Sequence, residues 1–311
     1  MPRTKRIEYA GAHYHVMSRG NNGQDIFLTD VGRRLFLDTL GEACEQMGWV
    51  FHAYVLMSNH YHLLMETPEP NLSNGMRWFQ GAYTQRFNAL FKRRGHLYQG
   101  RYKAVPVQTD PRDGGLEYFR EILTYIHLNP FRAKLFGEGC ERPLSDYAWS
   151  SYPAYIHQAE KVPAWLKRKK GYRAFGLSEQ SPESPTAFQH QLQRKMKFEV
   201  DPEGGRQGTY ENLNPQKWYA GSEAFLQRLT DQLNQTDKGD NYRGAQRKDH
   251  GQDGAEKLLI QCLKTMDLTE EELKGLKPAD LPKQLIAWKL KTCTSVTGVW
   301  ICKRIDMGHR S

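Results

Sequence analysis

The chain has 311 residues, which is enough for two domains or for one domain with a helical appendage. Its 44 lysines and arginines against 35 aspartates and glutamates give a formal net charge of +9, which favours a nucleic-acid partner but also fits an ordinary alkaline protein. Apolar runs such as 54–57 and 63–65 are too short to cross a membrane, and the basic N-terminus lacks the apolar segment of a secretory signal.

The spacing of apolar residues predicts a dense α+β unit in the first half of the chain. Alternating β-branched and aromatic residues indicate strands, whereas helical spacing indicates helices, the first of them capped by Asp30. The predicted elements are a strand over 14–19, a helix over 30–47, strands over 49–57 and 60–67, a helix from residue 71 or 73 to 90, a strand over 102–108 and a helix over 116–128. This order is typical of a split βαβ unit, so we expect an antiparallel sheet with helices on one face.

Composition divides the chain into three regions. Residues 1–157 contain the elements above and are expected to form one domain. Residues 158–254 are more polar, so we expect a partly disordered linker with short helices, while residues 255–311 regain apolar periodicity and predict a small all-α unit. The helices expected in the last two regions span 188–196, 222–233, 281–292 and 296–307. The segments expected to be flexible or disordered are 178–185, 201–208 and 237–254.

The first candidate site is the run His60-Tyr-His62 on the third predicted strand. Because residues i and i+2 of a strand point to the same face, the two imidazoles would stand side by side, roughly 7 Å apart at their Cα atoms, and both could ligate one metal ion. A sheet surface with two solvated histidines gives the same pattern. His13-Tyr-His15 is a second run of this kind, and both runs cannot be the site. Glu66 would point to the same face of this strand as His60, so it is a weaker candidate for a metal ligand.

The second candidate lies on the last helix of the first domain, where Tyr125 and Asn129 are four residues apart. Residues i and i+4 share a helix face, so the tyrosine hydroxyl and the amide oxygen would project together. Asn129 also ends this helix before Pro130, and a packed aromatic followed by an ordinary helix end gives the same pattern.

The third candidate is the basic segment 91–103, in which cations are interleaved with aromatic residues. Cations bind phosphates and aromatic rings stack on unpaired bases, so the segment is typical of a surface for single-stranded nucleic acid. A solvated loop beside a strand has the same composition. The candidate DNA-binding residues in this segment are Lys92, Arg93, Arg94, His96, Tyr98, Arg101 and Lys103.

Four segments in this order resemble the REP-associated tyrosine transposases, which belong to the single-tyrosine HUH transposases. The segments are YHVMSRGN over 14–21, AYVLMSNHYHLLMET over 53–67, GHLYQGRYK over 95–103 and YIHLNPFR over 125–132. The similarity covers about residues 8–157, half of the chain, and YAWSSY over 147–152 also matches. Agreement of several motifs makes the resemblance specific, whereas the HxH motif alone is not.

The resemblance implies a ferredoxin-like HUH nuclease core and a role for each matching residue. The implied positions are His60 and His62 for the HUH pair, Tyr125 for the nucleophile and Asn129 for the third metal ligand. The resemblance also implies that Arg19 contributes to DNA binding. It implies that His13 and His15 lie on the first strand, away from the catalytic role.

Enzymes of this family join the tyrosine to a DNA 5′ phosphate and leave a free 3′-OH, so they need no ATP. Ligation by nitrogen and oxygen without thiolate suits Mg²⁺ or Mn²⁺. Tyr125 has a reference pKa of about 10 and therefore has to lose its proton in or before the attack. The resemblance implies single-stranded hairpin DNA as the partner, and the expected oligomeric state is a monomer or a homodimer.

The five cysteines are scattered along the chain and form no CxxC pair. This pattern favours a reducing compartment and argues against a structural zinc site on thiolates. Together with the resemblance, it predicts a cytoplasmic protein that is associated with the bacterial nucleoid and has no membrane partner.

Residues 255–311 resemble the start of a helix-turn-helix appendage found on some longer family members. The chain reaches Ser311 where the recognition helix would begin, so we expect either a truncated appendage or a pair of packing helices.

Two other functions remain open for the first domain. A catalytically silent DNA-hairpin binder would use the same scaffold, although the presence of all four expected site residues favours activity. An RNA-binding protein would use the sheet, but the predicted strands lack the aromatic pattern usual in that class.

Overall fold

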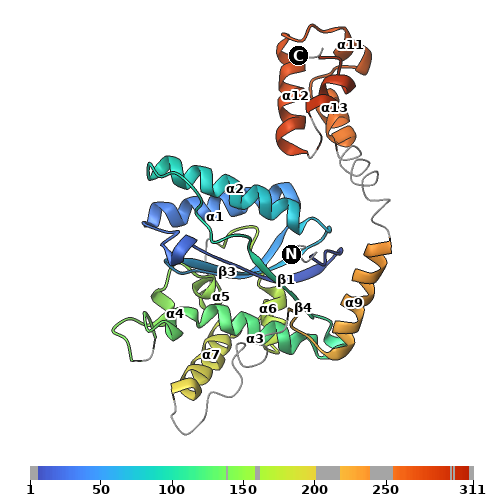
Figure 1. Cartoon of the computed structure of the whole chain (residues 1–311). Coiled ribbons are helices and arrows are strands. Elements are labelled where there is room, and N and C mark those ends of the chain that lie inside the picture. Colours follow the sequence, from blue (N-terminus) through green and yellow to red (C-terminus); the bar gives the residue numbers. More distant parts are fainter. Residues whose placement is uncertain are drawn as a thin grey trace. The chain divides into compact units, whose positions relative to one another are not determined.

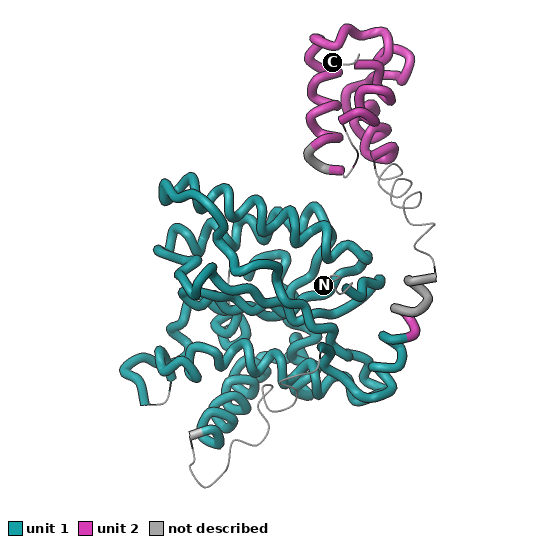
Figure 2. The backbone as a smooth tube through the Cα atoms, in the orientation of Figure 1, with its two compact units in different colours: residues 1–230 teal, residues 231–311 magenta. Residues whose placement is uncertain are grey.

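The computed structural model describes residues 6–137, 139–157, 162–200, 218–238, 255–294, 296 and 298–307. The chain forms two compact units that divide between Thr230 and Asp231 (Figure 2). None of the helices in the described ranges combines the length and the apolar character that crossing a lipid bilayer requires.

A four-stranded antiparallel sheet lies at the centre of the first unit (Figure 1). Its strands are β1 (Ala12–Arg19), β2 (Val50–Leu56), β3 (His60–Thr67) and β4 (Lys103–Val107), in the order β2-β3-β1-β4. The helix α1 (Asp30–Met47) connects β1 to β2, and α2 (Leu72–Leu90) connects β3 to β4. This is the connectivity of a ferredoxin-like split βαβ unit, and it confirms the predicted fold class.

The two connecting helices cover one face of the sheet, as predicted. Tyr14 and Val16 of β1 and Tyr61 and Leu63 of β3 face them and are buried in the same core as Phe36 of α1. Alternation along the strands therefore sends these residues toward α1 and α2 and sends their neighbours to the opposite face.

The N-cap of α1 differs from the prediction. Thr29, with extended backbone, accepts a hydrogen bond from the Gly32 amide through its side chain, and Asp30 is the first helical residue. A threonine at this position satisfies an amide that the helix leaves unpaired. The acidic Asp30 then lies in the first turn, where the helix dipole favours a negative charge.

The opposite face of the sheet is also covered, which the sequence pattern does not predict. Strands β2 and β3 also carry apolar residues that point away from α1 and α2, namely Ala53, Val55 and Leu64, and these need a second layer to cover them. The layer consists of α3 (Gly115–His127), α5 (Tyr152–Ile156), α6 (Lys169–Ala174) and α7 (Ser184–Val200). The shorter elements of this unit are η1 (Asn21–Gly23), η2 (Pro111–Asp113), α4 (Asn129–Arg132) and η3 (Leu144–Asp146). The two units divide within the helix α9 (Glu223–Lys238).

The predicted domain boundary at residue 157 is wrong, because much of the predicted linker packs on the first unit. The Lys167 amide donates to the Phe51 carbonyl, and Phe188 of α7 is fully buried in the core that includes α3. Residue Ala220 forms a parallel bridge with Val107 of β4. The segment 178–185, predicted to be flexible, contains a hydrogen bond of its own. The buried hydroxyl of Ser184 donates to the backbone carbonyl oxygen of Ser178. The predicted linker segment 201–208 lies outside the described residues. Of the predicted segment 237–254, residues 237 and 238 are the last of a helix that begins at Glu223, and residues 239–254 lie outside the described residues.

The second unit has its own apolar core. It contains helical residues 255–265, α11 (Glu270–Gly275), α12 (Leu281–Cys293) and α13 (Gly298–Arg304). Leu259, Leu273, Ile286 and Ile301 from these four helices meet in the core. The helix predicted over 281–292 is present as α12, and the one predicted over 296–307 as the shorter α13. Ser311, the predicted helix cap, lies outside the described residues.

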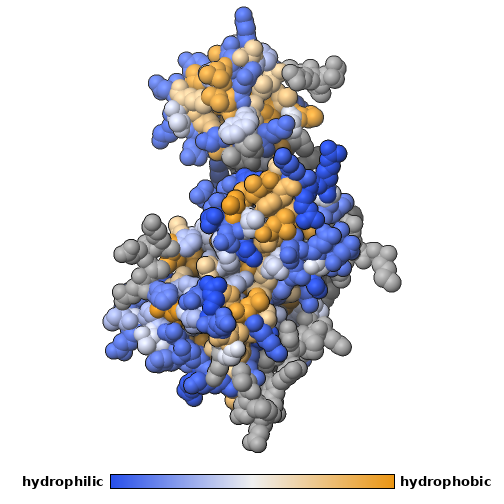
Figure 3. Space-filling model, turned by 90° about the vertical axis from the view of Figure 1, so that its left-hand side faces the viewer, coloured by the Kyte–Doolittle hydropathy of each residue, from blue (hydrophilic) through white to orange (hydrophobic). Residues whose placement is uncertain are grey.

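Apolar side chains are also exposed on the second unit, and hydrophobic areas alternate with hydrophilic ones on its surface (Figure 3). The large exposed ones are Ile260, Leu281, Leu285, Trp288 and Val299. Leu285 and Trp288 line a shallow pocket of about 180 Å³ together with Cys262 and Met266. This pocket has few polar groups and is no candidate for the predicted chemistry.

Candidate active site

The alternation of side chains along each strand and the register between β1 and β3 bring histidines of both strands to the face of the sheet that α3 covers. His60 is paired with Arg19 across the ladder, and His62 is paired with Met17. His15 of β1 points to the same face, because it lies two residues from Met17. These side chains form the candidate active site together with Tyr125 of α3 and Asn129 of α4.

His60 and His62 stand side by side, with ring centroids 5.2 Å apart. The Nδ1 of His60 lies 2.7 Å from the side-chain oxygen of Asn59, so this nitrogen carries the proton and donates it to Asn59. The other ring nitrogen, Nε2, then presents a lone pair, as a metal ligand must. Burial lowers the pKa of His60, partly opposed by a hydrogen bond with the Asn129 side chain. Burial lowers the pKa of His62 still further, so both rings are neutral near pH 7.

His15 belongs to this site, in contrast to the prediction that the first HYH run lies away from it. Its Nε2 is 3.0 Å from Nδ1 of His62, and its ring lies 5.8 Å from that of Tyr125, centroid to centroid. Burial lowers the pKa of His15 to about 3, so the ring stays neutral and can accept the proton of His62 Nδ1. The HYH motif at residues 13–15 is the feature of the sequence that could have identified His15 as a site residue. The β1–β3 register is needed to show that His15 stands beside His62.

Tyr125 lies over the histidines. Its ring is 5.3 Å from that of His62, at an interplanar angle of 86°. α3 ends at His127, and after Leu128 the chain continues directly into α4, whose first residue is Asn129. The bend at Leu128 does not separate the two side chains from the site, since Asn129 contacts His60 while Tyr125 contacts His62. The structure therefore brings together the four residues singled out from the sequence.

Arg132 is a site residue that was not singled out from the sequence. Its guanidinium carbon lies 5.1 Å from the centre of the Tyr125 ring, and its Nη1 donates to the Tyr125 carbonyl oxygen at 3.1 Å. A bidentate ion pair with Glu199 of α7, at 2.7 and 3.0 Å, holds the guanidinium in place. The pair thus fixes both the backbone and the ring of Tyr125.

Exposed cations border the site at the end of the sheet where β1 ends and β4 begins. The positive charge of Arg19 acts on His60, and that of Lys103 acts on His15, in each case lowering the histidine pKa. The segment before β4 is tied to this end of the sheet, because the Asn21 amide donates to the Leu97 carbonyl and the Gln99 amide to the Arg19 carbonyl. The predicted DNA-binding residues that are exposed there are Arg19, Lys92, Arg93, Arg94, His96, Arg101 and Lys103.

Tyr98 does not fit its predicted role as a stacking platform. Its side chain is 8% exposed and is buried in the core under α1 and α2, with its ring against Tyr61. A base cannot reach either face of such a ring. Tyr102, the other tyrosine of the segment, is buried as well.

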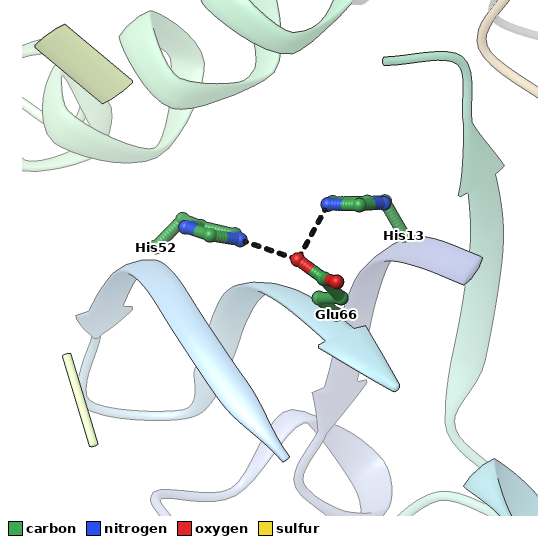
Figure 4. Close-up of side chains that lie close together, drawn as sticks. All are labelled: His13, His52 and Glu66. Atoms are coloured by element: carbon green, nitrogen blue, oxygen red, sulfur yellow. Dashed lines mark ion pairs between the residues drawn. The ribbon is translucent and has the colours of Figure 1, made fainter. Parts of the chain in front are cut away.

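Glu66 lies in a second cluster and not at the candidate active site. Its carboxylate is 3.0 Å from Nε2 of His13 and 3.6 Å from Nε2 of His52, as the dashed lines in Figure 4 indicate. Glu66 was a weaker candidate for the third ligand beside His60 and His62. Six residues along β3 separate it from His60, roughly 20 Å at the rise of a strand, which excludes that role.

Comparison with known proteins matches residues 8–121 to the family of IS200-like transposases, which confirms the resemblance to the single-tyrosine transposases. Among solved structures, the chain is similar to a REP-associated tyrosine transposase bound to a REP hairpin, with 15% identity and a TM-score of 0.41, over 54% of this chain and 92% of the other. It is also similar to a candidate transposase from Deinococcus radiodurans R1, with 21% identity and a TM-score of 0.28, over 38% of this chain and 95% of the other. No curated protein shows a significant match.

Proposed function

We propose that this chain, whose residues 8–121 match the IS200-like transposases, is a metal-dependent enzyme that cleaves and rejoins single-stranded DNA beside hairpins. The observation that carries the proposal is the convergence of His60, His62, Asn129 and Tyr125 on one face of the sheet. The partner would be hairpin DNA, by analogy with the similar structure bound to a REP hairpin. The protein would act in the cytoplasm at the bacterial nucleoid, as a monomer or a homodimer.

His60, His62 and Asn129 would hold a divalent ion, Mg²⁺ or Mn²⁺. The residues fit such an ion, because both imidazoles are neutral, the Nδ1 of each makes a hydrogen bond within the protein, and the Asn129 amide contacts His60. A bound divalent ion would withdraw charge from the non-bridging oxygens of the scissile phosphate.

Tyr125 would be the nucleophile. Its Oη forms a bond to the phosphorus while the bond from phosphorus to the 3′ oxygen breaks, and the proton lost by the tyrosine balances the one gained by the 3′-OH. Arg132 and Glu199 would keep the ring oriented, while Arg19 and Lys103 would hold the flanking phosphates. The 5′-phosphotyrosine keeps the free energy of the phosphodiester, so the 3′-OH of another strand can reverse the step without ATP.

The test is covalent capture of a labelled single-stranded DNA hairpin in the presence of Mn²⁺ or Mg²⁺. We expect the wild-type chain to form an adduct that survives denaturing electrophoresis and that chelation of the ion prevents. Tyr125→Phe should abolish the adduct and leave hairpin affinity within a few-fold, because only the hydroxyl is removed.

The matched control is Tyr118→Phe, which changes another tyrosine of α3 and should keep the adduct. An adduct that persists in Tyr125→Phe would show that the nucleophile is a different residue. Tight hairpin binding by the wild type with no adduct under any divalent ion would instead identify the chain as a catalytically silent hairpin binder.

A further inference from the structure

A second cluster of ligand-type side chains lies on the same face of the sheet as the candidate active site, at the other end of the strands. His13 comes from β1, His52 from β2 and Glu66 from β3, and the ligand atoms of all three lie within 4.8 Å of one another (Figure 4). His13 and Glu66 are directly paired in the ladder. The two imidazoles stack at 5.6 Å and 13°, and both meet the edge of Phe119 in α3.

His52 lies at an irregularity in the sheet. The β2–β3 register shifts between Phe51 and Ala53, so His52 is the extra residue of a β-bulge. Val50, two residues before His52, is paired with Glu66, so strand alternation puts His52 on the same side as Glu66.

Hydrogen bonds to the backbone determine which ring nitrogens carry protons. Nδ1 of His13 is 3.1 Å from the Gly11 carbonyl oxygen, and Nδ1 of His52 is 3.0 Å from the Lys167 carbonyl oxygen. A carbonyl oxygen only accepts, so each Nδ1 carries a proton and donates it. Each Nε2 is then the ring nitrogen that faces the Glu66 carboxylate, at 3.0 Å from His13 and 3.6 Å from His52. His52 Nε2 is buried and makes no hydrogen bond among the described residues.

Two imidazole nitrogens and a carboxylate that converge within 4.8 Å are a donor set that can hold a cation. In the structure, the ammonium group of Lys170 in α6 lies 2.5 Å from His13 Nε2 and 3.4 Å from Glu66 Oε2. These contacts of Lys170 reach His13 and Glu66, whereas His52 Nε2 lies 3.6 Å from Glu66 and makes no hydrogen bond among the described residues. Lys170 thus offsets the negative charge of Glu66, but it leaves His52 Nε2 without a hydrogen bond among the described residues.

We propose that His13, His52 and Glu66 bind a divalent transition-metal ion of the zinc type, which displaces the ammonium group of Lys170. The separations of 3.0 and 3.6 Å between each Nε2 and the carboxylate oxygen bracket the roughly 3.4 Å expected between ligands 2.0–2.1 Å from a tetrahedral ion. Two imidazoles favour zinc-type ions over Mg²⁺. The carboxylate is 28% exposed, which gives the ion a route to the site.

Such an ion would connect three neighbouring strands to one another. The lone pairs are oriented by Nδ1–H···O=C bonds, the usual support for histidines that ligate metals. The site does not depend on the proposed active site, from which it is separated by the length of β3.

The experiment is titration of the full-length chain with Co²⁺, followed by its visible absorption and by competition with Zn²⁺. The variant His60→Ala/His62→Ala serves as background, so that an ion at the proposed active site does not contribute. We expect one tightly bound Co²⁺ in this background and at least a tenfold weaker affinity when Glu66→Gln is added. Glu66→Gln keeps the shape of a partly exposed side chain, and circular dichroism reports whether the fold is retained.

A second variant separates a metal site from a simple lysine–carboxylate pair. Lys170→Met removes the competing cation, so it should raise the affinity for Co²⁺ at least tenfold. The proposal is overturned if Glu66→Gln leaves the number and affinity of bound Co²⁺ unchanged, or if Lys170→Met binds Co²⁺ no more tightly than the parent chain. Titration of the wild-type chain with and without Glu66→Gln gives the same test if the histidine background fails to fold.

Discussion

At the scale of single residues, hydrogen bonds at Nδ1 decide what the buried histidines can do. His60 donates to Asn59, and His13 and His52 donate to backbone carbonyls, so each ring is held with its Nε2 directed away from this support. His62 differs, because its Nδ1 partner is another imidazole, that of His15. The orientation of His62 therefore depends on a residue of a different strand.

We predict that His15→Ala lowers the rate of adduct formation and the affinity for Mn²⁺ by about 10- to 100-fold, the usual cost of losing the support of a metal-ligating histidine. Removing the imidazole leaves the buried Nδ1 of His62 without its acceptor. The amide oxygen of glutamine can accept the same proton, so His15→Gln should recover part of the rate of adduct formation and part of the affinity for Mn²⁺. Adduct formation by His15→Ala at the wild-type rate would show that His15 has no positioning role.

At the scale of elements, the close approach of α2 to the sheet depends on a glycine. A Cβ at Gly75 would overlap the ring of Trp49, whose indole donates to Asn71 at the start of α2. Asn71 also donates to the Met47 carbonyl at the end of α1. The two helices and β2 thus meet at one junction that has no room for a side chain at position 75.

We predict that Gly75→Ala destabilises the first unit by about 1–3 kcal/mol, the usual cost of overpacking a core. Gly81→Ala, in the same helix, is the matched control, because no atom lies within 4 Å of a Cβ there. It should be neutral or stabilise by up to about 1 kcal/mol, since alanine is the better helix former. Chemical denaturation gives both values, and equal effects of the two substitutions would contradict the packing argument.

The basic segment before β4 leads to a second prediction at this scale. Replacing Lys92, Arg93 and Arg94 by glutamine should weaken hairpin binding and reduce the salt slope by roughly 0.7 for each lost phosphate contact, or roughly 2 in all. Affinity is measured at several salt concentrations. The control replaces three exposed cations of α6 and α7, namely Arg173, Arg194 and Lys197, and should leave the slope nearly unchanged. An unchanged slope in the first variant would place the DNA-binding surface elsewhere.

At the scale of the whole molecule, the chain forms two units with separate apolar cores. The first contains the sheet with a helical layer on each face, and the second is formed only by helices. The proposed catalytic residues and the proposed metal site all belong to the first unit. Among the residues that the structure describes, those in the core of the first unit lie between 12 and 220, and those in the core of the second between 255 and 305.

We therefore predict that a chain ending at Asp240 keeps a cooperative fold, the same DNA cleavage position and a hairpin affinity within a few-fold of the full chain. A few-fold change corresponds to about 1 kcal/mol or less. Thermal unfolding, adduct mapping and binding curves check the three parts of this prediction. A tenfold loss of affinity or a shifted cleavage position would show that residues 241–311 take part in recognition.

Features that depend on local periodicity could be predicted from the amino-acid sequence alone. Alternation placed His60 and His62 on one face of a strand, helical spacing placed Tyr125 and Asn129 near each other, and the order of elements predicted the sheet. Each of these follows from a repeat of two or of 3.6 residues, which short segments of chain encode directly. The family resemblance added the roles of the four residues, which remain to be tested by the experiments above.

Which segments meet depends on the tertiary structure. His15 stands beside His62 because of the β1–β3 register, and His52 meets Glu66 because β2 pairs with β3, and neither pairing leaves a local signal in the sequence. Tyr98 is buried although its neighbours are charged, since its ring fills the core under α1 and α2. Residues 162–200 pack on the sheet because its second face also carries apolar residues, such as Val55 and Leu64, which have to be covered. Contacts between distant segments depend on register and packing, and these are set by the whole chain rather than by any one segment.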